Sequence, residues 1–270
     1  MLKLYQFGNS VCAQKVRVTM SEKGLDWETE EVDLFAGEQY SPEYLKLNPK
    51  GVVPTLVHDG AVIIESTLIC EYLDDCFPNP KLIPDDPHQR ARMRLWSKAV
   101  DEGLHEGVVE LSFSAMFRER MHKMPEEKRK ERFRNVGDVK RRDRFMSTFE
   151  LGVESPFVFQ AVGAYEKAFK NMEAALDEGG DWLLGNEFSL ADINMVPYVA
   201  RLHYLTLLDV WAADRPKVMH WWARAKARSS FEAAISSKLK PGELEEMQAS
   251  GPKIKDHILR LRSEYLSQFE

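Results

Sequence analysis

The sequence contains few cysteines and no long apolar run. Its 270 residues include only three cysteines, Cys12, Cys70 and Cys76, and no two of them form a CxxC pair. This pattern excludes a disulfide framework and a structural zinc site, so we expect no metal and a reducing, cytoplasmic setting. No window reaches the roughly 18 apolar residues of a membrane span, and the N-terminus lacks the basic and apolar regions of a secretory signal.

A basic excess, internal repeats and low-complexity tracts are also missing. The formal net charge is -6, which argues against nucleic acid as a general partner. Apolar residues make up 44% of the chain, enough to form hydrophobic cores. A chain of this length suits one large domain or two modest ones.

The first part of the chain alternates between strand and helix signals. The order is β-α-β, then a loop with a short helix, then β-β-α, with the first elements expected at residues 2–7, 11–23, 27–34 and 42–47. Residues 78–87 hold four prolines and provide the best domain boundary.

Beyond this boundary the pattern is helical. We expect one long helix over residues 88–121 and further helices at 156–177, 189–208 and 216–228, with Trp221 and Trp222 in the core. Residues 123–144 are rich in Lys and Arg, which favours a solvated loop or exposed helix over a basic lip above an acidic aromatic substrate. After Pro241 the tail is polar to Gly251, and then carries an apolar stripe typical of a short docked helix.

Residues 51–73 contain the strongest local signals. They predict a strand after Pro54, an Asp59-Gly60 hairpin, and a helix that opens at Glu65 and Ser66. A tight or cis bond before Pro54 would leave the backbone of Val53 free to pair with a ligand. Such a place could hold a small molecule with an ammonium and a carboxylate, but an ordinary capped hairpin explains the same residues.

Ser10 lies between the first strand and the first helix. The free N–H groups and the positive dipole end of that helix would stabilise a thiolate there, and Ser10 could donate a hydrogen bond to it. Ser10 could equally be a simple N-cap. For Cys12 we favour a small buried hydrophobic residue over a reactive thiol.

In order and spacing, these motifs resemble the cytosolic glutathione transferases. The resemblance covers residues 2 to about 234 and rests on Ser10 followed by CAQKVRV, NPKGVVPTL, ESTLICEYL, the proline-rich linker and GNEFSLADI. The last motif places Ser189 three residues before Asp192, as in an N-terminal capping box.

The resemblance implies a thioredoxin-like glutathione-binding domain (1–80), an all-helical acceptor domain (88–240) and a tail (241–270). Ser10 would activate the sulfur of glutathione, the co-substrate. The backbone of Val53, before Pro54, would pair with its cysteinyl part, and Glu65 and Ser66 would hold its γ-glutamyl ammonium and carboxylate. The remaining contacts would come from Gln39 at the glycyl end and from Lys50, which is offset from the usual basic position.

Two classes within this family share features with the chain. SVCAQKVRV is similar to the zeta class, the maleylacetoacetate isomerases, but Val11 replaces a second serine of that class and residues 121–156 are an insertion that it lacks. The insertion, the KLYQFG start, HDGAVIIEST and the helix around Ala91 to Trp96 resemble bacterial β-etherases that cleave aryl ethers of lignin.

Three hypotheses follow from these resemblances. The chain is a transferase acting on an aromatic or other electrophile, with β-ether cleavage as one form, or a glutathione-dependent isomerase, or a binding module without turnover. An acceptor would need an apolar wall, for which Phe113, Met116 and Phe117 are candidates, although core packing explains them as well. The family also implies a homodimer.

Overall fold

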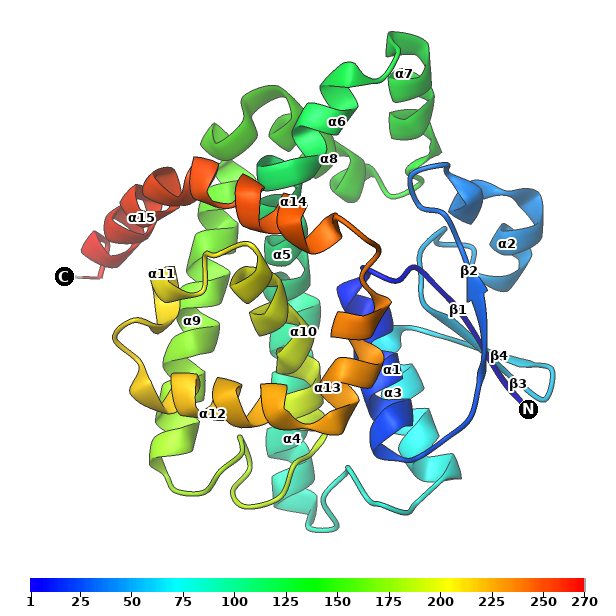
Figure 1. The fold of residues 1–270 in the computed structure, drawn as a ribbon, viewed down its shortest axis with the longest axis vertical. Coiled ribbons are helices and arrows are strands. Elements are labelled where there is room, and N and C mark those ends of the chain that lie inside the picture. The colour runs from blue at the N-terminus through cyan, green and yellow to red at the C-terminus, as the bar shows by residue number, and fades with distance from the viewer. Residues whose placement is uncertain (270) are drawn as a thin grey trace. The chain divides into compact units, whose positions relative to one another are not determined.

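The computed structural model describes residues 1–269, which divide into two compact units (Figure 1). The first unit comprises Met1–Ser97, Asp181–Pro197 and Ala223–Lys240. The second comprises Lys98–Gly180, Tyr198–Trp222 and the residues from Pro241 onward. Packing therefore groups segments that are far apart in the sequence, whereas the boundaries 1–80, 88–240 and 241–270 remain a prediction from motifs.

A four-stranded mixed sheet forms the centre of the first unit. The strands are β1 (Leu2–Gln6), β2 (Glu28–Glu31), β3 (Thr55–His58) and β4 (Ala61–Ile64), in the order β2-β1-β3-β4. The pair β1 and β2 is parallel, and β3 runs antiparallel to both β1 and β4. This arrangement confirms the thioredoxin-like fold that the motifs predict. β2 is shorter than predicted, because its four residues ETEE are exposed and form a charged sheet edge.

Helices cover both faces of this sheet. In Figure 1, α1 (Val11–Glu22) and α3 (Ser66–Cys76) lie on one face and α2 (Pro42–Leu47) on the other. Fully buried Leu4 and Leu56 come from β1 and β3, and the ring of Tyr5, which alternates with Leu4, packs at a tilt against Tyr44 of α2. The unit also contains the 3₁₀ turns η1 (Glu38–Tyr40) and η5 (Ser236–Lys238), most of α4 (Pro87–Ala99), and α13 (Ser229–Ala234), which packs on α1.

The second unit is helical, as expected. Two helices, α10 (Leu190–Tyr204) and α12 (Pro216–Ala227), contribute residues to both units. The rest of the second unit consists of α5 (His105–Ser112), α6 (Arg118–Lys123), α7 (Glu126–Asn135), α8 (Val139–Leu151), α9 (Pro156–Asp177), α11 (Asp209–Ala212), α14 (Glu243–Ser250), α15 (Pro252–Ser267), the π-helical segments η2 (Val100–Leu104) and η3 (Phe113–Phe117), and the 3₁₀ turn η4 (Gly152–Glu154).

The prediction of one long helix over residues 88–121 was wrong. The helix is interrupted at η2, where Gly103 has φ 154° and Glu102 leaves helical geometry. A residue with a side chain rarely adopts such a positive φ, so the glycine allows the break. A second π-helical segment, η3, follows directly where α5 ends at Ser112.

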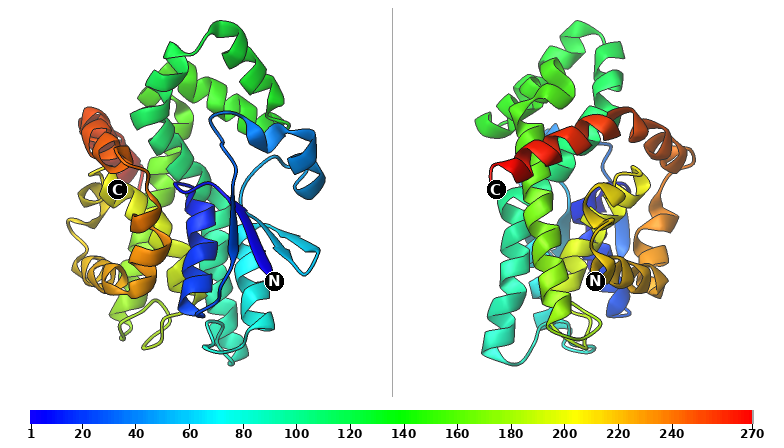
Figure 2. Two further views of the ribbon diagram at one scale, coloured as in Figure 1. Left: turned by 45° about the vertical axis from the view of Figure 1, so that its right-hand side comes forward. Right: turned by 90° about the vertical axis from the view of Figure 1, so that its left-hand side faces the viewer.

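Residues 123–144 form helices rather than a loop, and α7 has no buried residue. This confirms the prediction of an exposed helix for the basic insertion. The tail contains one more helix than expected, because the polar residues before Gly251 form α14. The predicted apolar stripe lies on α15, where Ile254 and Ile258 are buried. This helix packs on α9, which it crosses in the right-hand view of Figure 2.

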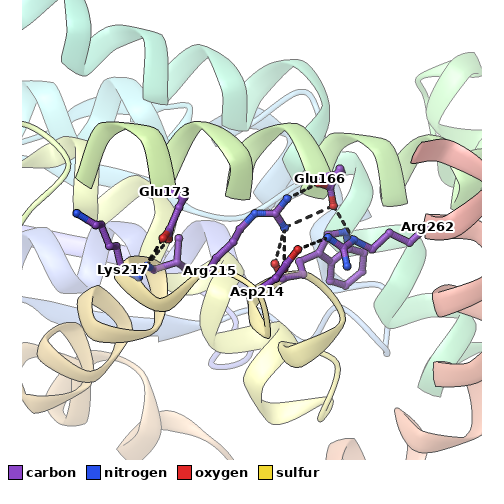
Figure 3. A network of polar contacts seen from close by, with 8 residues as sticks. Glu166, Glu173, Asp214, Arg215, Lys217 and Arg262 are labelled. Atoms are coloured by element: carbon purple, nitrogen blue, oxygen red, sulfur yellow. Dashed lines mark hydrogen bonds and ion pairs between the residues drawn. The ribbon is translucent and has the colours of Figure 1, made fainter. Parts of the chain in front are cut away.

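Buried charges tie α15 to α9 (Figure 3). Glu166 of α9 pairs with Arg215 and, at 2.7 Å, with Arg262 of α15. Arg262 also lies 3.5 Å from Asp214. Nearby, Lys217 and Val218 donate backbone hydrogen bonds to Glu173, which caps the start of α12. Trp221 and Trp222 are buried, as predicted.

Candidate functional site

The strand register gathers most of the predicted site residues of the first unit at one end of its sheet. Tyr5 of β1 pairs with Thr55 of β3, so the segment after β1 lies beside the segment before β3. Phe7 and Val53 accordingly pack in one buried cluster. Thr55 also pairs with Ile64 of β4, which places Glu65 and Ser66 next to Pro54.

Ser10 is the N-cap of α1. Its Oγ accepts a hydrogen bond from the backbone N–H of Ala13 at 3.3 Å, and its own backbone N–H donates to Phe7 at 2.9 Å. Within residues 1–269 no acceptor takes the proton of the Ser10 hydroxyl. The residue therefore caps the helix and keeps a donor available, so the two interpretations of Ser10 are compatible.

The loop that carries Ser10 is held by a buried guanidinium. Arg17 is fully buried and donates to the carbonyls of Gly8 and Ala234, each at 2.7 Å, and to the side chain of Gln6. Burial lowers the pKa of Arg17 to about 10. A Cβ atom on Gly8 would lie 2.7 Å from the carbonyl oxygen of Lys238, so this close approach requires glycine.

The Val53-Pro54 peptide bond is cis. The preceding carbonyl, of Val52, accepts hydrogen bonds from Tyr44 Oη at 2.7 Å and Asn48 Nδ2 at 2.9 Å, so α2 holds this segment from one side. Burial raises the pKa of Tyr44, which remains a hydrogen-bond donor. No group in the described part of the chain hydrogen-bonds to the Val53 backbone, and its pairing with a ligand stays a prediction.

Glu65 has an unusual backbone. Its φ of 71° and ψ of 111° place it outside the conformations that non-glycine residues favour, and such strain is often found at functional positions. Its carboxylate lies 2.6 Å from Lys50 Nζ, and both side chains are about half exposed. Ser66 is buried at the first position of α3, where the helix N–H groups lack intrahelical acceptors.

Gln39 is buried in η1, at the same end of the sheet. Its Nε2 donates to the carbonyl of Leu34 at 3.4 Å, while its Oε1 has no hydrogen-bond partner among residues 1–269. An unpaired buried amide oxygen is costly, so a ligand that donates to it would be favoured there. Gly51 approaches η1 closely, because a Cβ atom at this position would meet the ring of Tyr40 at 2.9 Å.

The three acceptor candidates lie in the second unit, on the π-helical segment η3. Phe113 and Met116 are buried, and Phe113 stacks on Phe145 with centroids 6.0 Å apart. Phe117 is half-buried, with the guanidinium of Arg120 5.7 Å from its ring centroid. Packing thus accounts for Phe113 and Met116, while Phe117 is partly accessible.

All three cysteines are free thiols. Cys12 is half-buried near the start of α1, and burial raises the pKa of the fully buried Cys70. The described residues contain no group of three His, Cys, Asp or Glu side chains suited to a metal ion. Nor does any helix within residues 1–269 have the length and apolar character needed to cross a membrane.

Sequence reasoning missed several residues that build this site. Arg17, Tyr44 and Asn48 position its segments, and Lys15 of α1 reaches Thr67 of α3. Hydrophobic periodicity could not reveal them, because it treats a lysine or arginine as a solvent-exposed residue. The only signal for Asn48 and Tyr44 was their proximity to the NPKGVVP motif.

Family comparisons agree with both parts of the chain. Residues 9–76 match the family described as "Glutathione S-transferase, N-terminal domain", and residues 128–224 match "Glutathione S-transferase, C-terminal domain".

Individual relatives extend this result. The chain is 35% identical to Protein LigF of Sphingobium sp. strain SYK-6 over 194 residues, which is 71% of this chain and 75% of LigF. The crystal structure of that protein, described as the beta-etherase LigF, superposes with a TM-score of 0.77 at 31% identity and covers 87% of this chain and 99% of LigF. Maleylacetoacetate isomerase of Mus musculus is 38% identical over 103 residues, covering 37% of this chain and 48% of the isomerase.

Proposed function

The chain belongs to the glutathione S-transferase family, and from this premise we propose that it activates glutathione as a thiolate for attack on an electrophilic, aromatic acceptor. The observation that carries the proposal is the geometry of Ser10. Its hydroxyl keeps a free proton to donate, and it lies at the N-terminus of α1, where the helix dipole favours negative charge. Both features stabilise a thiolate relative to a thiol.

The other residues at this end of the sheet would bind the peptide. The free backbone of Val53, beside cis Pro54, pairs with the cysteinyl residue. Glu65 accepts from the γ-glutamyl ammonium, and the hydroxyl and N–H of Ser66 donate to the γ-glutamyl carboxylate. Gln39 Oε1 accepts the N–H of the glycyl residue, and Lys50 orients Glu65 through their ion pair.

The acceptor in this proposal carries an aryl-oxide leaving group, as in a β-aryl ether ketone. The thiolate attacks the ether carbon, which a neighbouring carbonyl makes electrophilic. A carbon–sulfur bond forms, the carbon–oxygen bond breaks, and the aryl oxide leaves and takes a proton from water. The 35% identity to LigF, whose crystal structure is described as that of a beta-etherase, supports this form of the reaction.

Phe113, Met116 and Phe117 remain our candidates for the apolar wall of the acceptor site. Their position on a π-helical segment supports this assignment, because π-bulges occur frequently at functional sites. Phe117 is the strongest of the three, since packing does not bury it fully. We further propose a homodimer, as is usual in the family.

An isomerase that uses glutathione transiently is the second candidate function. The similarity to maleylacetoacetate isomerase supports it, but that match spans only 37% of this chain. The binding module is less favoured, because a module without turnover has no need for a serine proton that is free to activate a sulfur.

Ultraviolet difference spectroscopy tests thiolate formation. Adding glutathione to the wild-type protein at neutral pH should produce a thiolate absorbance band, and Ser10→Ala should lose it together with about a hundredfold or more in kcat/KM. Because Ser10→Ala also removes a helix cap, we expect about 1 kcal/mol of lost stability, too little to unfold the protein. A wild-type protein without the band would be the binding module.

Product analysis separates the two enzymatic hypotheses. The protein is incubated with glutathione and either a β-aryl ether ketone or a maleyl diacid. Release of the phenol with formation of a glutathione thioether supports the transferase. Isomerisation of the diacid without release of a phenol from the ether would favour the isomerase.

A further inference from the structure

Lys15 of α1 is a buried cation without a protein counter-ion. Its side chain is in a fully buried residue, and its Nζ donates to Thr67 Oγ1 at 2.8 Å. No carboxylate in the described part of the chain forms an ion pair with it. A hydroxyl can accept a hydrogen bond from an ammonium but does not neutralise it, so the charge of Lys15 remains uncompensated by any carboxylate of residues 1–269.

A second buried lysine, at the other end of α1, shows how this fold otherwise buries an ammonium. Lys23, at the C-cap of α1, is also buried, and it pairs with Asp74 at 2.6 Å. It also donates to the carbonyls of Phe77 and Pro80, at 2.6 and 2.8 Å. All three of its donors are thus satisfied within the protein.

The carboxylate of Glu71 on α3 is already paired with another cation. Both Lys15 and Glu71 act electrostatically on Cys70, whose pKa is raised by burial and pulled back by Lys15. Glu71, however, pairs with Arg94 at 2.8 Å through two hydrogen bonds. Leaving a buried cation unpaired destabilises a fold, so its presence points to an anion supplied from outside.

Thr67 indicates where that anion would be. It follows Ser66 in the first turn of α3, where free N–H groups face an incoming carboxylate. Lys15 bonds to Thr67 from the buried side of this turn. The helix N-terminus and the Lys15 ammonium therefore both add positive potential at the first turn of α3.

We propose that Lys15 is a positioning residue for the γ-glutamyl carboxylate of glutathione. Its ammonium, hydrogen-bonded to Thr67 in the first turn of α3, provides the positive charge that balances this carboxylate. This inference rests on the proposed function. It implies that the buried charge of Lys15 favours glutathione binding but costs stability in the free protein. Replacing Lys15 should therefore weaken glutathione binding without destabilising the free protein.

Calorimetric titration with two peptides tests the proposal. One is glutathione, and the other is 4-aminobutyryl-cysteinyl-glycine, which keeps the ammonium but lacks the carboxylate. Lys15→Met should weaken glutathione binding about ten- to a hundredfold and change binding of the second peptide less than about threefold. Lys15→Arg keeps the charge and should recover part of the loss. In turnover assays Lys15→Met should raise the KM for glutathione more than it lowers kcat.

Thermal unfolding of the free protein provides the matched control. Lys15→Met should leave the Tm unchanged or raise it, because it removes an unpaired buried charge, whereas Lys23→Met should lower it by breaking a satisfied pair. Equal weakening of both peptides, or a Tm loss in Lys15→Met like that in Lys23→Met, would assign Lys15 a structural role and overturn the inference. A wild-type protein that binds no glutathione would instead refute the proposed function itself.

Discussion

At the scale of single residues, the first helix separates what sequence can predict from what it cannot. Ser10 was predicted at the start of α1, and the structure places it there as the N-cap. The helix over residues 11–23 was also predicted, and Val16 and Met20 on it are buried. Lys15 and Arg17 were not predicted as buried. Their burial depends on contacts with α3 and with the Ala234 carbonyl, more than 200 residues later in the chain.

The interior role of Arg17 leads to a prediction. Arg17→Met would leave the carbonyls of Gly8 and Ala234 and the Gln6 oxygen without their donor, so we expect a loss of about 2–4 kcal/mol in the free energy of unfolding. Because Gly8 belongs to the loop that carries Ser10, the thiolate band with glutathione should also weaken. Urea denaturation and difference spectroscopy measure the two effects.

Arg94→Met is the matched control for this variant. Arg94 is more than half exposed and pairs with Glu71, so its replacement should cost less than about 1 kcal/mol. Equal costs for the two variants would mean that the Arg17 hydrogen bonds do not hold the loop.

At the scale of elements, the sequence predicted where helices lie but not where they are interrupted. Local periodicity identified α9 with the correct bounds, yet it joined α4, α5 and α6 into one helix. The break at Gly103 was missed because an isolated glycine is tolerated in many helices. The two π-helical segments, η2 and η3, leave no periodicity signal of their own.

The contact between α5 and α8 predicts a pH dependence. Burial raises the pKa of Glu110 above its ordinary value of 4.5, and hydrogen bonds from Thr148 and Arg144 offset only part of the rise. Glu106 on the same helix also faces Arg144. The folded protein therefore holds the Glu110 proton more tightly than the unfolded chain does. Its contribution to stability is complete below pH 4.5 and is lost as the pH rises through the folded-state pKa.

Urea denaturation of wild type and Glu110→Gln between pH 4 and 7 measures this effect. The stability of the wild type relative to Glu110→Gln should be greatest near pH 4 and should fall toward pH 7, since all other titrations cancel in the difference. A difference that grows with pH would mean that the Arg144 pair, rather than burial, controls this carboxyl.

At the scale of the molecule, the family and the two parts of the fold were predictable from motif order, but the grouping of segments was not. α13 lies beyond four-fifths of the chain and packs on α1 in the first unit. No local pattern tells a helix which distant partner it will cover. For the same reason, the packing of α15 on α9 could be expected only as an unspecified docking.

The close contact between Gly251 in the tail and the backbone of Leu205 yields a prediction. A Cβ atom on Gly251, between α14 and α15, would lie 1.6 Å from the carbonyl oxygen of Leu205, so Gly251→Ala must displace backbone. We expect it to cost more than about 3 kcal/mol. Gly137→Ala is the control, since a Cβ at Gly137 meets nothing within 4 Å. Similar thermal unfolding of both variants would show that the tail does not depend on this contact.

The discontinuity of the first unit has a consequence for biosynthesis. Residues 1–97 emerge from the ribosome first, but α13 and the Ala234 carbonyl that receives Arg17 emerge only with residues 223–240, roughly 140 residues later. At about 5–20 residues per second, this delay lasts about 7–30 seconds. During that time the nascent sheet and α1 expose a surface that chaperones and proteases can recognise. Chains whose translation stalls between residues 97 and 223 would therefore contain all of β1 to β4 and yet be cleared by the cell.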